Sequence, residues 1–334
     1  MAADIAEQPS VYAGLMEPAH AGAIAAVATV IAERQPRHVV FTARGTSDHA
    51  ALYAAYLSEI RLGLPAGLAS PSGITLFGAR PDLSHALVVG VSQSGGSPDL
   101  AEVLRVARAS GALTLAVTNN PDSPLAETAE LSIDVAAGHE RAVAATKTYT
   151  AELLALLMLV EGIRAGGQPP LAELAALPAL AAQALESASV AGHAARYRFA
   201  ARLLTTGRGY AYATAREAAL KLMETSYLPA LAFSGADLLH GPLAMADPDV
   251  PVLAVVGSGP GGAAMRDVLA RLGERRADVL TVGAAGEIAV PDVDERLAPL
   301  LDILPLQRLA LELALARGED PDAPRALNKV TTTL

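Results

Sequence analysis

The chain has 334 residues, of which 52% are hydrophobic, with no cysteine and a formal net charge of −10. The lack of cysteine excludes a disulfide scaffold, a thiolate metal site and a cysteine nucleophile. The acidic charge argues against nucleic-acid and anionic-membrane partners, because both are bound through clustered lysine and arginine. The length predicts two domains or two fused lobes.

The N-terminal ten residues, MAADIAEQPS, contain neither the basic nor the apolar segment of a secretory signal, so we expect a cytoplasmic protein. The most apolar helical stretch, residues 153–160, is far shorter than the roughly 20 residues that cross a bilayer. The seven histidines show no metal-binding spacing such as H-x3-H or HExxH. We therefore expect no metal, no cofactor and no membrane association.

Apolar runs alternate with helical patterns through the first half of the chain, which predicts a parallel α/β sheet. The expected strands are 38–44, 86–92, 113–118 and 131–135, and the expected helices are about 47–62, 98–110 and 147–164.

The second half repeats this pattern. Segments 202–209, 252–259 and 279–283 lie 164 or 165 residues after matching strands of the first half. A repeat at a near-constant offset predicts two tandem doubly wound lobes, each a flavodoxin-like three-layer αβα unit. The expected boundaries are an N-terminal helical segment 1–34, a first lobe 35–168, a second lobe 169–319 and a C-terminal tail 320–334, with the linker at 165–174.

Polar residues follow two strands of the first lobe. Ser92, Gln93, Ser94 and Ser97 lie between a strand and a helix, and Gly45, Thr46 and Ser47 follow another strand. Ligands of such sheets bind at the carboxyl ends of strands, and a helix N-terminus presents unpaired N–H groups to anions. Each turn alone could equally be a helix cap, with Ser97 or Ser47 as the N-cap. Neither is a Walker or GxGxxG loop, so the pair favours a small phosphorylated ligand.

Three charged residues share one helical face in the second half. Glu217, Lys221 and Glu224 are spaced i, i+4 and i+7, which suits a base beside a cation for proton transfer next to a carbonyl. A solvated salt-bridge stripe is the more frequent explanation of such spacing. His240 lies before Gly-Pro, and a lone histidine of this kind is more often structural than catalytic. Lys329 lies near the C-terminus, where a lysine would ordinarily be part of a frayed, solvated tail.

The motifs GTS, SQSG, EAALKLMETSY, LLHGPLA and PRALNK occur here in the order of the sugar-isomerase (SIS) lobes of glutamine–fructose-6-phosphate amidotransferase. The segments AEQP at 6–9 and ERAVAATKTYT at 140–150 also resemble that family. The resemblance covers nearly the whole chain, and it implies a double-SIS fold that binds a hexose 6-phosphate.

The resemblance also implies residue roles. Glu224 would be the base that moves a proton between C1 and C2, with Lys221 and Glu217 beside it. His240 would open the sugar ring across a homodimer interface, and Lys329 would form a Schiff base with the open-chain ketose. The phosphate would be held by Ser92, Gln93, Ser94 and Ser97, and the sugar by Gly45, Thr46, Ser47 and the backbone near Val143.

The departures from the family bear on the reaction. Gly96 replaces the acidic residue of the family's SQSGE loop, Met223 replaces a lysine, and the cysteine-dependent glutaminase domain is missing. We therefore expect an amino-sugar-phosphate deaminase/isomerase of the type that converts glucosamine 6-phosphate to fructose 6-phosphate. The alternatives are a synthase-like isomerase subunit without a glutaminase domain and a non-catalytic sugar-phosphate sensor. The choice among gluco, galacto and fructosamine substrates stays open.

Overall fold

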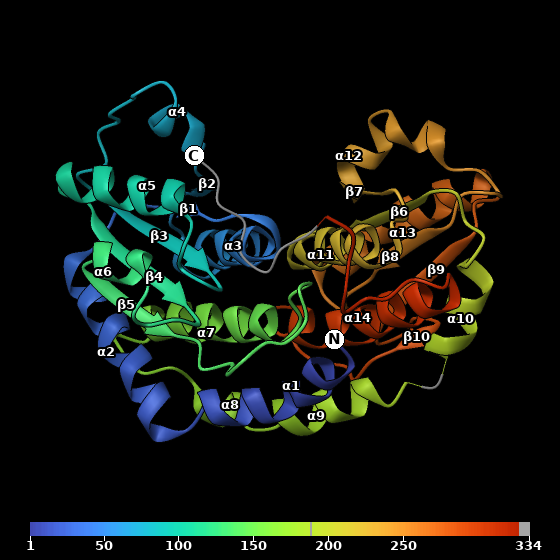
Figure 1. Cartoon of the computed structure of the whole chain (residues 1–334), viewed down its shortest axis with the longest axis horizontal. Coiled ribbons are helices and arrows are strands. Elements are labelled where there is room, and N and C mark those ends of the chain that lie inside the picture. Colours follow the sequence, from blue (N-terminus) through green and yellow to red (C-terminus); the bar gives the residue numbers. More distant parts are fainter. Residues whose placement is uncertain (188, 327–334) are drawn as a thin grey trace. The chain divides into compact units, whose positions relative to one another are not determined.

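The computed structural model describes residues 1–187 and 189–326 (Figure 1). Lys329, and with it most of the expected tail, lies outside the described residues. The chain forms two compact units. The first-lobe unit contains residues 10–140 and 147–177. The second-lobe unit contains 178–326 together with two segments from earlier in the chain, 1–9 and 141–146.

The first-lobe sheet has five parallel strands in the order β2-β1-β3-β4-β5. The strands are β1 (His38–Thr42), β2 (Ala66–Leu68), β3 (Ala86–Ser92), β4 (Leu113–Thr118) and β5 (Leu131–Asp134). The helices are α2 (Pro18–Arg34), α3 (Gly45–Leu57), α4 (Pro71–Thr75), α5 (Pro98–Ala109), α6 (Pro124–Thr128), α7 (Lys147–Arg164) and α8 (Leu171–Leu174), and a turn of π-helix, η1 (Ser58–Leu62), follows α3.

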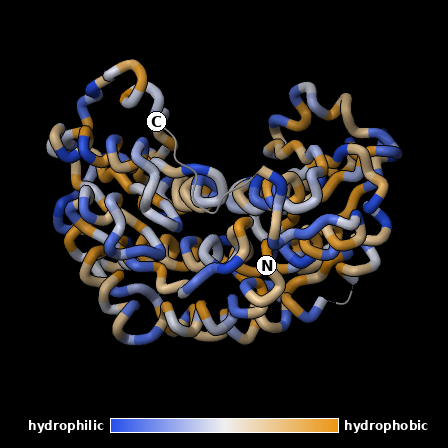
Figure 2. Tube along the Cα trace, in the orientation of Figure 1, coloured by the Kyte–Doolittle hydropathy of each residue, from blue (hydrophilic) through white to orange (hydrophobic). Residues whose placement is uncertain are grey.

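Burial explains these elements. Every residue of β3 and β4 is buried, as expected of parallel strands covered on both faces. Helices α4, α5 and α6 pack together on one face, and α2, α3 and α7 on the other. Helix α7, which contains the apolar stretch 153–160, is buried over residues 147–162 and is a core helix. Figure 2 shows hydrophobic and hydrophilic residues intermixed along the surrounding helices.

The second-lobe sheet repeats the topology, in the order β7-β6-β8-β9-β10. Its strands are β6 (Leu203–Gly207), β7 (Ala230–Ser234), β8 (Val252–Val255), β9 (Val279–Gly283) and β10 (Ile288–Ala289). The helices of this unit are α9 (Leu177–Leu185), α10 (Val190–Tyr197), α11 (Tyr210–Ser226), α12 (Gly235–Leu239), the 3-10 turn η2 (Pro242–Met245), α13 (Pro260–Glu274) and α14 (Ala298–Ala316), and the N-terminal part of α1 (Ala2–Leu15) belongs to it.

Both sheets therefore have the flavodoxin-like order 2-1-3-4-5, which confirms the predicted pair of doubly wound lobes. The repeat extends to single residues. Gly45 begins α3 with φ +55°, and Gly209 immediately precedes α11 with φ +57°. Each glycine has a positive φ after the first strand of its lobe, and a positive φ favours glycine.

The predicted elements differ from the structure mainly at their ends and at the edges of the sheets. The strand expected at 38–44 ends at Thr42, and the helix expected at 47–62 begins at Gly45 and changes to π-helix at Ser58. The strands β2, β7 and β10 were not predicted. Among the described residues no single helix is both long and apolar enough to cross a membrane, although two bent helix pairs meet that requirement jointly.

Candidate functional site

The loops that follow β1 and β3 begin at the carboxyl ends of neighbouring strands. Strand β1 pairs with β2 on one side and with β3 on the other. The connection from β1 leads to one edge of the sheet, whereas the connections from β3 onward lead to the opposite edge, so the order of the strands switches between β1 and β3. In open α/β sheets the ligand crevice lies at this point. The two polar turns predicted from the sequence, residues 43–47 and 92–97, are therefore brought to the position where such sheets bind ligands.

The loop 92–97 is organised by its own hydroxyl groups. The Ser92 hydroxyl accepts a hydrogen bond from the Gly95 N–H at 3.2 Å, and the Ser94 hydroxyl accepts one from the Gly96 N–H at 3.2 Å. Ser97 precedes the first residue of α5, as predicted, but its side chain makes no capping hydrogen bond. The Ser97 hydroxyl is therefore not used to cap α5, and it lies beside the positive end of that helix.

Gly95 makes the tightest turn of this loop. Its φ is +62°, and a Cβ atom there would lie 2.0 Å from the Ser123 Oγ, which accepts a hydrogen bond from the Ala126 N–H. The carbonyl of Gly95 also accepts from the Leu125 N–H at 3.1 Å. The path of the loop thus depends on the absence of a side chain at this residue.

We expect Gly95→Ala to weaken binding of inorganic phosphate or a sugar phosphate by about tenfold or more, because a left-handed alanine costs about 1–2 kcal/mol before its clash with Ser123 is relieved. Calorimetric titration measures the change. Gly22→Ala is the matched control, since Gly22 is helical, has a normal φ, and has no atom within 4 Å of the added Cβ. Equal affinity in the two variants would contradict the role given to the loop.

Two further contacts fix the loops. Arg44 makes a two-pronged ion pair with the buried Asp99 carboxylate, with Nε and Nη2 at 2.9 and 2.8 Å from Oδ2, and so ties the turn after β1 to the first turn of α5. The Asn120 side chain donates to the Ser94 carbonyl at 3.3 Å, and the Asn119 N–H donates to the Gln93 carbonyl at 3.2 Å.

A pocket of about 370 Å³ opens beside the loop. It is lined by Gln93, Ser94, Asn119, Asn120, Gly138, His139 and Glu140. The sequence analysis did not single out the asparagines or the arginine–aspartate pair. The signal for the asparagines was present, because they too follow a strand end.

Ser47 lies within the first turn of α3 and is not its N-cap, which is Arg44. The buried Ser47 hydroxyl donates to Oε1 of Glu152, a fully buried residue of α7, at 2.8 Å. Because its proton is engaged, the Ser47 oxygen can offer a ligand only lone pairs. It suits a sugar hydroxyl, which donates, better than a phosphate oxygen, which accepts.

In the second-lobe unit, Glu217, Lys221 and Glu224 lie along α11 as their spacing predicts. The Lys221 Nζ is 3.4 Å from Glu217 Oε1 and also forms an ion pair with Glu224 Oε2. The side chains of Glu217 and Lys221 are fully buried, whereas that of Glu224 is 24% exposed. The alternative of a solvated stripe is therefore wrong for two of the three residues. Glu224 is the carboxylate of this triad that reaches solvent.

Helix α14 packs along α11. The Thr225 hydroxyl donates to the Lys221 carbonyl at 2.8 Å and approaches the Ala310 carbonyl at 3.4 Å. His240 is the residue that follows α12, and its side chain is exposed. Its backbone N–H donates a hydrogen bond to the Asp237 carbonyl at 3.0 Å.

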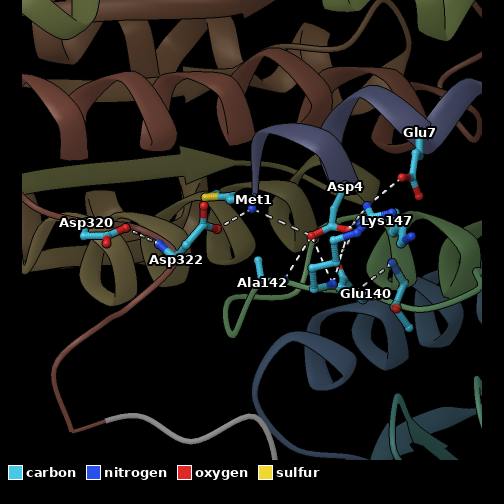
Figure 3. Close-up of polar contacts among 10 residues, drawn as sticks. Met1, Asp4, Glu7, Glu140, Ala142, Lys147, Asp320 and Asp322 are labelled. Carbon is cyan, nitrogen blue, oxygen red and sulfur yellow. Dashed lines mark hydrogen bonds and ion pairs between the residues drawn. The ribbon is translucent and has the colours of Figure 1, made fainter.

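Val143 belongs to a segment, 141–146, that a buried carboxylate holds in place (Figure 3). Asp4, on α1, is fully buried and accepts from the Ala142 N–H at 3.0 Å and the Arg141 N–H at 3.2 Å. Arg141 also pairs with Glu7 at 2.7 Å. This role of Asp4 was not predicted from the sequence, because the two backbone N–H groups that it binds lie 137 and 138 residues further along the chain.

A second buried carboxylate lies where this segment leaves the first-lobe unit. Glu140 accepts from the backbone N–H groups of Lys147 and Thr148 at 3.0 and 3.2 Å, at the start of α7 (Figure 3). A carboxylate is favourable at a helix N-terminus. Within the described part of the chain, no group of three or more His, Asp or Glu side chains is arranged to hold a metal ion.

The site residues predicted from sequence therefore fall into two sets. The first-lobe unit carries Gly45, Thr46, Ser47, Ser92, Gln93, Ser94 and Ser97, and the second-lobe unit carries Val143, Glu217, Lys221, Glu224 and His240. In the first-lobe unit the set lies in the first turn of α3, at the end of β3 and in the loop that follows β3. In the second-lobe unit it lies in segment 141–146, on α11 and at the end of α12.

Comparison with known proteins agrees with this architecture. The SIS domain model matches residues 34–162 and 197–284. The chain is 35% identical over 307 residues to the glutamine–fructose-6-phosphate aminotransferase [isomerizing] of Methanothermobacter thermautotrophicus, covering 88% of this chain and 51% of the relative. The chain thus spans about half the length of that curated relative.

Solved structures of phosphosugar isomerases and related domains have the same fold. A candidate phosphosugar isomerase from Silicibacter pomeroyi has a TM-score of 0.85 and 34% identity, with 96% of this chain and 98% of that chain covered. The C-terminal domain of glucosamine-fructose-6-phosphate aminotransferase from Francisella tularensis has a TM-score of 0.85 and 26% identity, with 96% and 97% covered. The fold alone is shared with the glucosamine-6-phosphate deaminase of Thermotoga maritima, at a TM-score of 0.80, 23% identity, and 99% and 98% coverage.

The fold and its loops thus define a double-lobed α/β protein of the sugar-isomerase class. This chain belongs to the SIS domain family, with two SIS segments homologous to the isomerase domain of glutamine–fructose-6-phosphate aminotransferases.

Proposed function

We propose that this protein is an enzyme that isomerises an amino-sugar 6-phosphate and releases its amino group as ammonia, in the manner of glucosamine 6-phosphate to fructose 6-phosphate. The observation that carries the proposal is the Glu217–Lys221–Glu224 triad, in which two buried charges position one solvent-accessible carboxylate. A positioned carboxylate is what proton transfer between two adjacent carbons requires.

In this proposal the first-lobe loops bind the substrate's phosphate end. Ser92, Ser94 and Ser97 offer hydroxyls, and α5 offers its positive end, so no cationic side chain is required. Ser47 accepts from a sugar hydroxyl. A phosphate remote from C1 and C2 supplies binding energy that holds the reacting carbons in register.

The proton balance of the reaction is simple. Ring opening, which we assign to His240, exposes the C1 aldehyde. Glu224 removes the proton from C2 and returns it to C1. One proton also passes from the C2 amine to the C1 carbonyl oxygen, so C1 becomes an alcohol and the amine at C2 becomes an imine. Water adds to this imine, ammonia leaves, and the C2 ketone of the ketose 6-phosphate remains. Lys329 is proposed as the amine that forms a Schiff base with the ketose.

We propose the release direction; the two SIS lobes contain no cysteine, and so no thiol of their own with which to take ammonia from glutamine. We also propose that the protein acts as a homodimer, since His240 is exposed at the end of α12 and the family uses this histidine across an interface. Sedimentation velocity checks the dimer.

The proposed reaction is tested by a coupled ammonia-release assay on glucosamine, galactosamine and fructosamine 6-phosphates. We expect ammonia in equal amounts with a ketose 6-phosphate from glucosamine or galactosamine 6-phosphate, or with an aldose 6-phosphate from fructosamine 6-phosphate, whose amine is on C1. Micromolar binding of all three without turnover would contradict an enzyme and support a sensor. Ammonia-dependent formation of an amino sugar from fructose 6-phosphate, without the reverse reaction, would support a synthase-like subunit.

A further inference from the structure

The second lobe has its own counterpart of the loop 92–97. Strand β8 occupies the third position of its sheet, as β3 does in the first lobe, and the loop 256–259 leads from it into α13. Both α5 and α13 begin with proline, at Pro98 and Pro260. The fold therefore presents a second helix N-terminus at the position where the first lobe presents its polar loop.

A carboxylate of the chain itself occupies this second position. The Gly261 N–H donates to Glu295 Oε2 at 3.2 Å, and the Gly262 N–H donates to Glu295 Oε1 at 3.0 Å. Both N–H groups belong to the first turn of α13, a helix of 15 residues whose dipole is positive there. The two oxygens are bound as two oxygens of a phosphate would be at a helix N-terminus.

The backbone encloses the carboxylate closely. A Cβ atom would lie 2.3 Å from Glu295 Oε2 if built on Gly259, and 2.5 Å from Oε1 if built on Gly261. One built on Gly257 would lie 3.1 Å from Oε1. A side chain at any of these three positions would crowd or collide with the carboxylate, so glycine there lets the main chain approach the anion closely.

The segment after the fifth strand differs between the lobes. In the first lobe this segment includes Gly138 and His139, and it leaves the 370 Å³ pocket against Gln93 and Ser94. In the second lobe it runs from β10 to α14, and it inserts Glu295 into the glycine loop while Asp292 accepts a hydrogen bond from Ser258. The same position is open in one lobe and filled in the other.

A buried acid beside Glu295 completes the second-lobe arrangement. Asp302, on α14, is 1% exposed, and its Oδ2 has no hydrogen-bond partner among the described residues. Burial, and secondarily the charge of Glu295, raises the pKa of Asp302 well above its usual range. Burial therefore favours the neutral form of Asp302, and the carboxylate bound at the helix end is that of Glu295.

We propose that the second lobe contains a phosphate-binding cradle that Glu295 occupies as an internal anion, and that removal of this carboxylate exposes a second site for inorganic phosphate or a phosphate monoester. A tethered carboxylate acts at an effective concentration on the order of millimolar or higher, so dilute phosphate does not displace it. The native chain thus offers one open phosphate loop although its fold contains two.

The test counts phosphate ions bound per chain. Inorganic phosphate is titrated into the full-length protein by calorimetry, with circular dichroism and thermal melting as folding checks. We expect Glu295→Ala and the more conservative Glu295→Ser each to bind one phosphate more per chain than the wild type. The matched control is Glu274→Ala, an exposed glutamate of α13 paired with Arg271, which should bind the wild-type number. A crystal of Glu295→Ala grown in phosphate should show the ion at the Gly261 and Gly262 N–H groups.

Two results would overturn the proposal. One is that both folded Glu295 variants bind the wild-type number of phosphates. The other is a wild-type crystal in which phosphate already occupies the α13 end with Glu295 displaced. The readout is a difference between variant and wild type, so it does not depend on the first-lobe loop. Failure of that loop to bind would instead appear as zero phosphate in the wild type and one in Glu295→Ala.

Discussion

Glu224→Gln should lower kcat for ammonia release by about 10²- to 10⁴-fold while leaving substrate affinity within a few-fold of the wild type, since an amide cannot accept the C2 proton. The substitution keeps the shape of the side chain and an oxygen that can accept from Lys221, and Lys221 retains Glu217 as its ion-pair partner. Initial rates of ammonia release and calorimetric affinities, measured on the same preparation, separate the two quantities.

Glu274→Gln is the matched control for this variant. Glu274 lies at the end of a helix of the same unit, pairs only at the surface with Arg271, and is 64% exposed. It should keep the wild-type rate. A Glu224→Gln variant with more than a tenth of the wild-type rate would require another residue as the base.

Lys221→Met should destabilise the second-lobe unit by about 3–5 kcal/mol, because it leaves the Glu217 carboxylate buried without its cation. Both side chains are fully buried, so solvent does not compensate the lost ion pair. Urea unfolding followed by circular dichroism measures the change, and activity should be lost as well because Glu224 loses the cation that positions it.

The double variant Lys221→Met/Glu217→Met distinguishes a loss of stability from a loss of function. Removing both charges of a buried pair is often neutral or stabilising, so we expect stability to return to within about 1 kcal/mol of the wild type. Activity should stay low, since Glu224 remains without its ammonium partner. Recovery of both stability and activity would mean that the pair serves the core alone.

The parts of the fold that the sequence predicted are those with strong local signals. The fully buried strands β3 and β4 are continuous apolar runs, and the prediction gave both strands with their observed ends. The missed strands β2, β7 and β10 lie toward the sheet edges, where two to five residues with mixed exposure carry little pattern. Their strand character comes from pairing with a neighbour already in place.

The same distinction holds for the candidate site. The i, i+4, i+7 spacing indicated that Glu217, Lys221 and Glu224 share a face, but it did not show that two of them are buried. Burial depends on tertiary packing, and α14, which packs along α11, begins more than 70 residues further along the chain. The backbone N–H groups that Asp4 binds are more than 100 residues away, as is the Glu152 carboxylate that Ser47 binds. No local pattern marks a contact of that kind, because each residue alone resembles an ordinary helical polar residue.

The composition of the second-lobe unit has a consequence for synthesis of the protein on the ribosome. Residues 1–9 and 141–146 belong to this unit, and their partners lie late in the chain. The Thr146 carbonyl accepts a hydrogen bond from the Gln307 side chain at 3.2 Å, and the Met1 amino group forms an ion pair with Asp322. These early segments emerge long before their partners. They can bind each other through Asp4 and Arg141, but they cannot complete their docking in this unit until residues 307–322 have been translated. We therefore expect them to be binding sites for a chaperone on the nascent chain and to gain protection from proteases late.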